Sequence, residues 1–442
     1  MSGSRRSLPG GGRVAQVRPT ARGTAVLAAS LVLVGTGTAL GLTDIVGLGA
    51  SGLLVVAAAW AWMVVRRIDR GRGALRVARR IEPDPAVRGN QVTTRLLVSP
   101  VSPNATALGR LGRLQISEQA AAELCEHDAL RAQVVSHPDR IAVRYRLRPD
   151  HRGRWPLGPV LTSRVDVFGL VRARQPLGEA STVSVRPRTT ELAVRGSRAF
   201  GDLARSRNGA RTSSSDDSVL REYVAGDDPR RVHWATAARR GQLMVRTDEN
   251  AGMASVTVLL DRGVLPPPDT DRSSSVARDG EWAVEAAASV AVTLLGAGHP
   301  VRLVASSAAP TLDAYPYSTG RTSDGAAQIL DDTIDLGGHA NPRDAERALA
   351  ATADALRGSR RPGELTVAVL GPLGAISGPS VAPLAGDGNH WAFVVAPDGD
   401  RPGSAVEDTL SVLRAIGWLA VGVDPRETTI SAAWNRLMEE HR

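Results

Sequence analysis

Side chains that could perform chemistry are concentrated in residues 220–246, which read LREYVAGDDPRRVHWATAARRGQLMVR. His233 could act as a general base and Asp227 could orient it. Catalysis of this kind also needs a nucleophile, and the sequence marks none. The candidate site residues of the stretch are Arg221, Tyr223, Gly226, Asp227, Asp228, Arg230, His233, Trp234, Arg239 and Arg246.

The local sequence predicts how these side chains are positioned. Asp228 is a good N-cap residue, and Pro229 suits the first position of a helix. The helix can continue to Arg240, because Gly241 is a natural left-handed stop. The apolar residues 243–245 then predict a short buried strand. A polar loop, a three-turn helix and a strand are therefore expected in succession.

Three interpretations of this stretch are open. Asp227 can pair with Arg239 or Arg246 in a structural network that joins two domains, because buried charges need partners. The same side chains can form a surface on which a partner docks. The third interpretation is a hydrolase that uses Asp227, His233 and the arginines. We expect a structural or docking role and assign no catalytic residue.

Several common catalytic and cofactor motifs are missing from the sequence. All 54 basic residues are arginine, so no lysine can serve a phosphate-binding loop, and the loop motif itself does not occur. The chain also has no H-E-x-x-H, C-x-x-C or G-x-S-x-G motif. Its single cysteine, Cys125, fits a reducing compartment and is expected to be an ordinary small residue. We expect no cofactor.

Residues 221–246 resemble the central motif of the domain of unknown function 58 family. The matching positions are Arg221, Tyr223, Gly226, Asp227, Arg230, Trp234, Ala238, Arg239, Leu243, Val245 and Arg246, with Val232 in place of an isoleucine. Two upstream segments also match, HRGRWPLGP at residues 151–159 and DVFGL at residues 166–170. The resemblance spans about residues 60–442. It implies a von Willebrand factor A-like domain in the later part of the chain and a partnership with a MoxR-type AAA+ ATPase.

Two apolar runs near the N-terminus predict a transmembrane hairpin. Residues Thr24–Leu42 and Ile45–Val65 are each close to the ~20 residues that span a bilayer, and only Thr43 and Asp44 separate them. A cleaved signal peptide is the alternative for the first run, but the run exceeds the usual apolar length and lacks a clear cleavage site. Trp60 and Trp62 lie near the end of the second run, as interfacial tryptophans do.

The distribution of charge predicts the orientation of this hairpin. Residues 1–80 contain twelve arginines and two acidic residues, a net charge of +10, whereas the whole chain has +9. The basic excess therefore flanks the hairpin, which places both outer ends and the later domains in the cytoplasm of the cell. These arginines can contact anionic lipid. Nucleic acid is not expected as a partner, since the remaining 362 residues have a net charge of −1.

The sequence predicts an α/β plus all-β protein with several segments. Residues 1–23 are a basic tail, 24–65 the transmembrane hairpin, and 73–190 an immunoglobulin-like β-sandwich with short alternating strands. Within the sandwich, the Ala- and Glu-rich residues 117–128 predict a local helix. Residues 197–218 are a flexible linker and 219–250 the motif segment. Residues 251–442 alternate strands and helices, which predicts a parallel sheet covered on both faces.

Asp261 raises the question of a metal site. Von Willebrand factor A domains often hold Mg²⁺ through Asp-x-Ser-x-Ser after the first strand, because hard cations need clustered oxygen ligands. Here Asp261 is followed by Arg262, Gly263 and, at the second serine position, Leu265. We therefore expect Asp261 to be a degenerate remnant that binds no metal and instead caps the loop or pairs with an arginine. A metal-dependent ligand-binding module is the alternative.

Together these features predict a multi-pass protein of the cell membrane with cytoplasmic termini and domains. We expect a scaffold or adaptor that is not an enzyme and that works with a MoxR-type ATPase in the assembly or remodelling of protein complexes. The uncharacterised hydrolase and the metal-dependent binder are the alternatives.

Overall fold

The computed structural model describes two compact units, Met1–Val185 and Arg186–Arg442, and each is considered by itself. The described residues are 16–65, 74–112, 114–125, 132–193, 219–222, 244–247, 253–268, 270–271, 274–319, 323–361, 363–385, 390–396 and 405–439. Most of the motif segment, residues 223–243, lies outside them.

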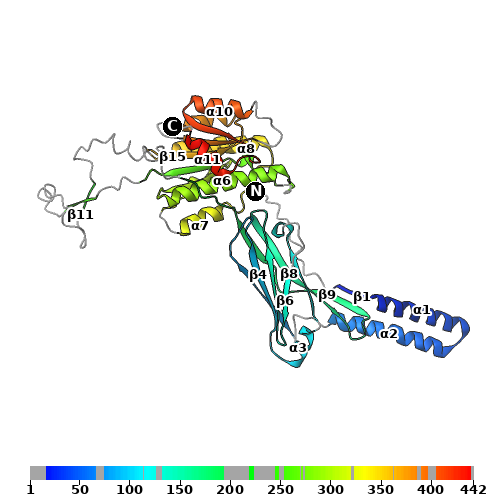
Figure 1. Ribbon diagram of the computed structural model, residues 1–442. Coiled ribbons are helices and arrows are strands. Elements are labelled where there is room, and N and C mark those ends of the chain that lie inside the picture. The colour runs from blue at the N-terminus through cyan, green and yellow to red at the C-terminus, as the bar shows by residue number, and fades with distance from the viewer. Residues whose placement is uncertain are drawn as a thin grey trace. The chain divides into compact units, whose positions relative to one another are not determined.

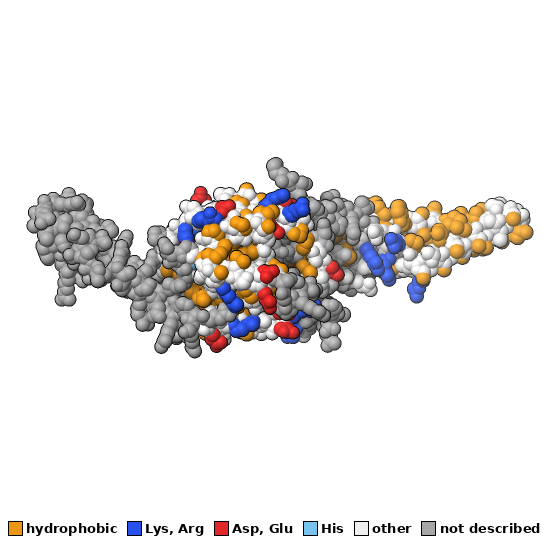
Figure 2. All heavy atoms as spheres, turned by 90° about the horizontal axis from the view of Figure 1, so that it is seen from above, with side chains coloured by type: hydrophobic (Ala, Val, Ile, Leu, Met, Phe, Trp, Pro, Cys, Tyr) orange, Lys and Arg blue, Asp and Glu red, His pale blue; other side chains and the backbone are white. Residues whose placement is uncertain are grey.

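Two long antiparallel helices form the apolar part of the first unit (Figure 1). They are α1 (Ala21–Leu40) and α2 (Thr43–Val65), and Gly41 ends α1 in the left-handed conformation with φ 71°. Glycines allow their backbones to approach closely, since a Cβ at Gly49 would lie 2.7 Å from the Ser30 carbonyl oxygen. Figure 2 shows apolar side chains along this helix pair and basic side chains at its sheet end. Both helices are long and apolar enough to cross a membrane.

Two antiparallel sheets make up the rest of the first unit. The six-stranded sheet has the order β1 (Gln16–Pro19), β9 (Val171–Leu177), β8 (Gly153–Val165), β10 (Ser181–Arg186) and β3 (Ala86–Val87), with β5 (Gln115–Ala120) also paired to β8. The four-stranded sheet has the order β2 (Leu75–Glu82), β4 (Val92–Pro100), β7 (Ile141–Leu147) and β6 (Ala132–Ser136). Their inner faces share one apolar core, which includes Leu96 and Leu147 from one sheet and Leu157 and Leu177 from the other. The immunoglobulin-like type of the sandwich stays a prediction.

The helix predicted within residues 117–128 is wrong over its described part. Residues 115–120 form β5, followed by a 3₁₀ turn at Ala122–Leu124, and a helix occurs earlier as α3 (Ala105–Leu111). The strand is favoured because Ile116 and Ala120, four residues apart in β5, both pack on the sandwich core. Glu118 lies on the same side and pairs with Arg79, so its charge has a buried partner. Tertiary packing thus overrides the helix propensity of the segment.

A short strand before the two apolar helices belongs to the sandwich. β1 pairs with β9 in antiparallel register from Gln16 opposite Arg174 to Pro19 opposite Val171. Thr20 follows at once, donates its backbone N–H to the Leu170 carbonyl at 2.8 Å, and caps α1 by accepting from the Gly23 N–H at 3.1 Å. The apolar helix pair therefore continues directly from a sheet strand.

The second unit contains a five-stranded parallel sheet with helices on both faces (Figure 1). Its order is β14 (Val301–Ala305), β13 (Val256–Leu260), β15 (Leu365–Leu370), β16 (His390–Val395) and β17 (Trp418–Val423). One face packs on α6 (Ser275–Gly296), α7 (Ser323–Asp332) and α11 (Ile430–Glu439), the other on α8 (Pro342–Gly358), α9 (Gly378–Val381) and α10 (Ala405–Ala415). The predicted parallel sheet is confirmed. A separate antiparallel pair joins β11 (Val219–Glu222) to β12 (Met244–Thr247).

The contact between α1 and the turn that joins β8 to β9 can be tested with two glycines of the same helix. A Cβ at buried Gly23 would lie 2.0 Å from the Leu170 carbonyl oxygen, whereas a Cβ at Gly35 would meet nothing within 4 Å. We expect Gly23→Ala to destabilise full-length protein in detergent by about 1–3 kcal/mol, as overpacking does. Gly35→Ala should keep or raise stability, because alanine favours helix by about 1 kcal/mol. Equal thermal unfolding midpoints for the two variants would contradict the contact.

Candidate functional site

Two of the ten motif candidates lie in the described part of the chain. Arg221 is in β11 with its backbone opposite Val245, and Arg246 is in β12 opposite Leu220. The strand predicted at residues 243–245 is present from Met244. The other eight candidates lie outside the described residues: Tyr223, Gly226, Asp227, Asp228, Arg230, His233, Trp234 and Arg239. Their structural, docking or hydrolytic role stays a prediction.

The carboxyl edge of the parallel sheet is the second candidate site. The chain leaves β13 toward β14 on one side, whereas β15 lies on the other side. Ligands of open α/β sheets bind at such a reversal of strand order. Three residues follow these strand ends directly, Asp261 after β13, Ser306 after β14 and Gly371 after β15. Asp261 is therefore the carboxylate placed where a ligand would be expected.

The Asp261 carboxylate is buried and bonded within the protein. The residue is 6% exposed. One carboxylate oxygen accepts from the Gly263 N–H at 2.7 Å, which caps the 3₁₀ turn Arg262–Val264, and the other accepts from the Gly371 N–H at 3.1 Å. Burial raises the pKa of Asp261 even though these amides and the Ser306 hydroxyl favour its charged form. Asp261 thus caps the loop, one of the two roles that the sequence predicted.

Neighbouring groups complete this network. Ser306 Oγ accepts from the Arg262 N–H at 2.8 Å, and Arg262 Nε donates to the Gly337 carbonyl at 2.6 Å. The side chain of Arg262 is therefore held by the loop that precedes α8. Burial and the nearby Arg262 lower the pKa of His339, which favours a neutral imidazole beside the guanidinium. Sequence reasoning identified Asp261 but missed Ser306, since a serine after a strand carries no distinctive spacing.

Within the residues that the structure describes, no three His, Cys, Asp or Glu side chains lie close enough together to hold a metal ion. Asp261 has both carboxylate oxygens committed to amide donors, and its raised pKa disfavours the anion that a hard cation needs. These observations support the metal-free interpretation of Asp261, which stays a prediction.

The amino edge of the same sheet carries a buried charge network that the sequence analysis missed. Glu364 is 2% exposed and accepts from Arg302 Nη2 at 3.1 Å and from the Tyr317 hydroxyl at 2.6 Å. Arg302 also donates to Thr257 at 2.7 Å. Burial opposes the charge of Glu364, but hydrogen bonds from Thr257 and Tyr317 with the charge of Arg302 outweigh it and hold the pKa of Glu364 below its usual value. Because each charge has partners, we interpret this network as structural.

A comparison with protein families gives one match. Residues 219–374 fit the model described as "Protein of unknown function DUF58". This segment of the chain therefore matches the DUF58 family. The segment starts at β11, contains the motif, and includes both β13 with Asp261 and β15 with Gly371. A comparison with curated proteins gives no match.

Several solved structures show weaker likeness to this chain. A von Willebrand factor type A structure from Catenulispora acidiphila is 16% identical, covers 44% of this chain, and has a TM-score of 0.29. This chain covers 43% of that structure, less than half of its length. The PilB minor pilin from Streptococcus sanguinis is 11% identical, with coverage of 80% and 84% and a TM-score of 0.27. TM-scores this low carry no argument about fold or function.

The role of Asp261 as an internal cap predicts a loss of stability without any dependence on metal. We expect Asp261→Ala to lower the free energy of unfolding by about 1–3 kcal/mol, because the Gly263 and Gly371 amides lose their acceptor. The exposed Asp313→Ala is the matched control and should change it little. Chemical denaturation with and without Mg²⁺, Mn²⁺ or Ca²⁺ measures both effects. A metal-dependent gain in stability that disappears in Asp261→Ala would support the metal-dependent binder instead.

Proposed function

We propose that this DUF58 protein is a membrane-anchored cytoplasmic scaffold or adaptor that works with a MoxR-type AAA+ ATPase. The observation that supports it most is the direct continuation of β1 into α1, which ties two apolar helices to a folded sheet. An anchor joined in this way holds the sandwich at a fixed place beside the bilayer. This arrangement suits a protein that presents a surface to partners.

The exposure of the two helices supports a membrane anchor. Helices of 20 and 23 residues are long enough to cross a bilayer. Only 17% of the most apolar window of each helix is buried, and large side chains such as Leu54 and Val65 are 69% and 79% exposed. A core helix of a soluble domain would bury such side chains, because exposed apolar surface is unfavourable in water. Lipid would cover them here.

Arginines support the orientation that we propose. Arg18 and Arg22 are exposed where α1 begins, and Arg172 and Arg174 are exposed on β9, which pairs with β1. The cytoplasmic side of a membrane carries such an excess of arginine and anionic lipid. Both ends of the hairpin and the domains that follow are therefore assigned to the cytoplasm.

An exposed sheet edge in the first unit offers a surface for a protein partner. β6 pairs with β7 on one side and ends the four-stranded sheet, and all five of its residues are exposed. The backbone N–H of His137, the residue after β6, donates to the Arg140 carbonyl at 2.8 Å and therefore points toward β7. Antiparallel alternation then directs the N–H of Val135 toward β7 and that of Val134 away from it. A partner strand could extend the sheet along this edge, a common mode of peptide recognition.

A crosslinking pull-down from membranes tests the proposal. With ATP present, full-length protein should capture an AAA+ ATPase of the MoxR type, identified by mass spectrometry. Val134→Pro removes an outward N–H while keeping the pairing with β7, so we expect capture to fall about fivefold or more. Val134→Thr keeps the N–H and should capture as wild type does. Failure of wild type to capture any such ATPase would sink the partnership. If Val134→Pro captured as much ATPase as wild type, β6 would not be part of the interface.

A further inference from the structure

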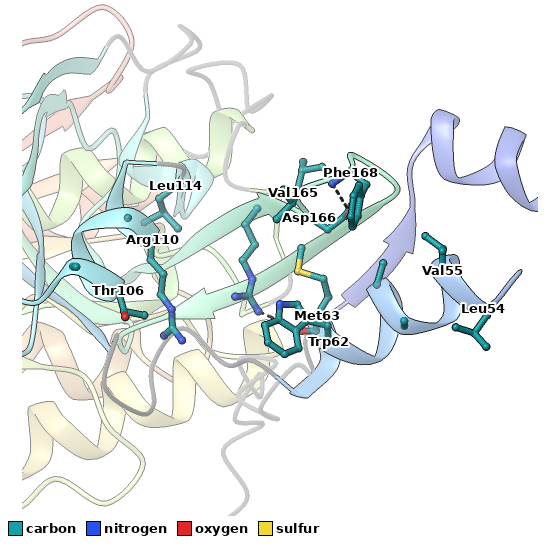
Figure 3. Close-up of a pocket in the computed structure, with 16 residues that line it drawn as sticks. Leu54, Val55, Trp62, Met63, Thr106, Arg110, Leu114, Val165, Asp166 and Phe168 are labelled. Atoms are coloured by element: carbon teal, nitrogen blue, oxygen red, sulfur yellow. Dashed lines mark hydrogen bonds between the residues drawn. The ribbon is translucent and has the colours of Figure 1, made fainter. Parts of the chain in front are cut away.

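A pocket of about 700 Å³ lies within the first unit, beside the sheet end of the membrane helices (Figure 3). Its lining comes mainly from α2 between Leu54 and Met63, from α3 between Ala105 and Arg110, and from the end of β8 with the turn that follows it, Arg164 to Phe168. Its volume is in the range of ligand sites. All residues that line the pocket belong to the first unit, whereas Asp261 belongs to the second.

The apolar wall of this pocket is continuous with the surface that faces lipid in the proposed anchor. Leu54 and Trp62 line the pocket and are exposed on α2. Val167 and Phe168 at the tip of the β8–β9 turn also line it and are 82% and 71% exposed. So much exposed apolar and aromatic surface beside an apolar helix is unfavourable in water and is typical of the membrane interface.

The position of the β8–β9 turn along α1 and α2 places the pocket at the boundary of the proposed membrane. The carbonyl of Leu170 packs on Gly23, one residue before the apolar run that begins at Thr24. Leu170 and Val171 share a buried apolar cluster with Val56 and Met63 of α2. The turn therefore lies alongside the first turns of α1 and the last turns of α2, where lipid headgroups meet acyl chains.

Positive charge distinguishes this pocket from a plain apolar groove. Arg110 of α3 lines the pocket (Figure 3), as does Arg164 of β8, which donates to the Met63 carbonyl at 3.3 Å. Asp166 also lines the pocket, but its two oxygens accept from the Phe168 N–H at 3.0 Å and the Val171 N–H at 2.7 Å. Two half-buried arginines and one carboxylate, which accepts from amides of its own turn, thus line the pocket. Guanidinium groups bind phosphate oxygens in a fork geometry.

We propose that this pocket binds one anionic phospholipid of the bilayer. The lipid phosphate contacts Arg110 and Arg164, and an acyl chain lies along α2 and the side chains of Val167 and Phe168. This inference rests on the proposed membrane anchor, and it goes beyond the general attraction of exposed arginines to an anionic surface. It gives the anchor a preference for one class of lipid and lets a bound lipid stabilise the joint between helices and sandwich.

Native mass spectrometry of full-length protein in detergent tests the proposal, with dioleoyl phosphatidylglycerol and dioleoyl phosphatidylcholine as probes. We expect a one-to-one adduct with phosphatidylglycerol that forms about tenfold more tightly than with phosphatidylcholine. Arg110→Gln should weaken phosphatidylglycerol binding about tenfold, because it loses a charge-assisted hydrogen bond. Gly109→Phe should weaken binding of both lipids, since the space around Gly109 is open and the ring would fill the pocket. Arg172→Gln, an exposed arginine outside the pocket lining, should bind as wild type does.

Other outcomes overturn the proposal. Equal binding of the two lipids, or equal loss in Arg172→Gln and Arg110→Gln, would show general surface electrostatics and no selective pocket. Displacement of the lipid by millimolar inorganic phosphate would identify a soluble anion as the occupant. Carbonate extraction of the wild-type protein from membranes separates this inference from its premise. Protein that resists extraction but fails to discriminate lipids contradicts only the pocket, whereas protein that is extracted contradicts the anchor itself.

Discussion

The first backbone N–H groups of any helix have no partners inside the helix, and the surroundings must supply acceptors for them. Here Thr20 supplies an acceptor through its side chain, and its own N–H is held by the Leu170 carbonyl of the β8–β9 turn. The preceding residues pair with β9 as a strand. Sheet ladder, helix cap and turn therefore form one joint. The proposed anchor, its orientation and the lipid pocket beside it all depend on this joint.

In the second unit, polar groups close both edges of an apolar parallel sheet. At the carboxyl edge, Asp261 binds the amides of Gly263 and Gly371, which occupies the position where α/β sheets hold ligands. At the amino edge, Glu364 forms an ion pair with Arg302 and accepts a hydrogen bond from the Tyr317 hydroxyl. Removing one member of such a buried set leaves an uncompensated polar group. These buried networks thus stabilise the parallel sheet in the described part of the DUF58 segment.

Features with a strong local period could be predicted from the sequence. The parallel sheet predicted for residues 251–442 is present, because buried strands such as Leu365–Leu370 and Trp418–Val423 are continuous apolar runs between turns. Features that depend on distant partners could not. The helix predicted at residues 117–128 was wrong, because the described part of that segment pairs with β8 as a strand. The strand β1 was not predicted, because four residues are too few to show an alternating pattern. Arg302, a charge inside an apolar strand, was a signal that could have revealed the Glu364 network.

The joint between anchor and sandwich can be measured by disulfide formation across β1 and β9 in membranes. In a Cys125→Ala background, Val17→Cys with Ala173→Cys places two thiols opposite each other in the register of the structure. Val17→Cys with Arg172→Cys is the mismatched control, because a shift of one residue turns the second side chain to the other face. We expect rapid crosslinking of the first pair and little of the second. No crosslink in the first pair, or equal crosslinking of both, would contradict the continuous joint.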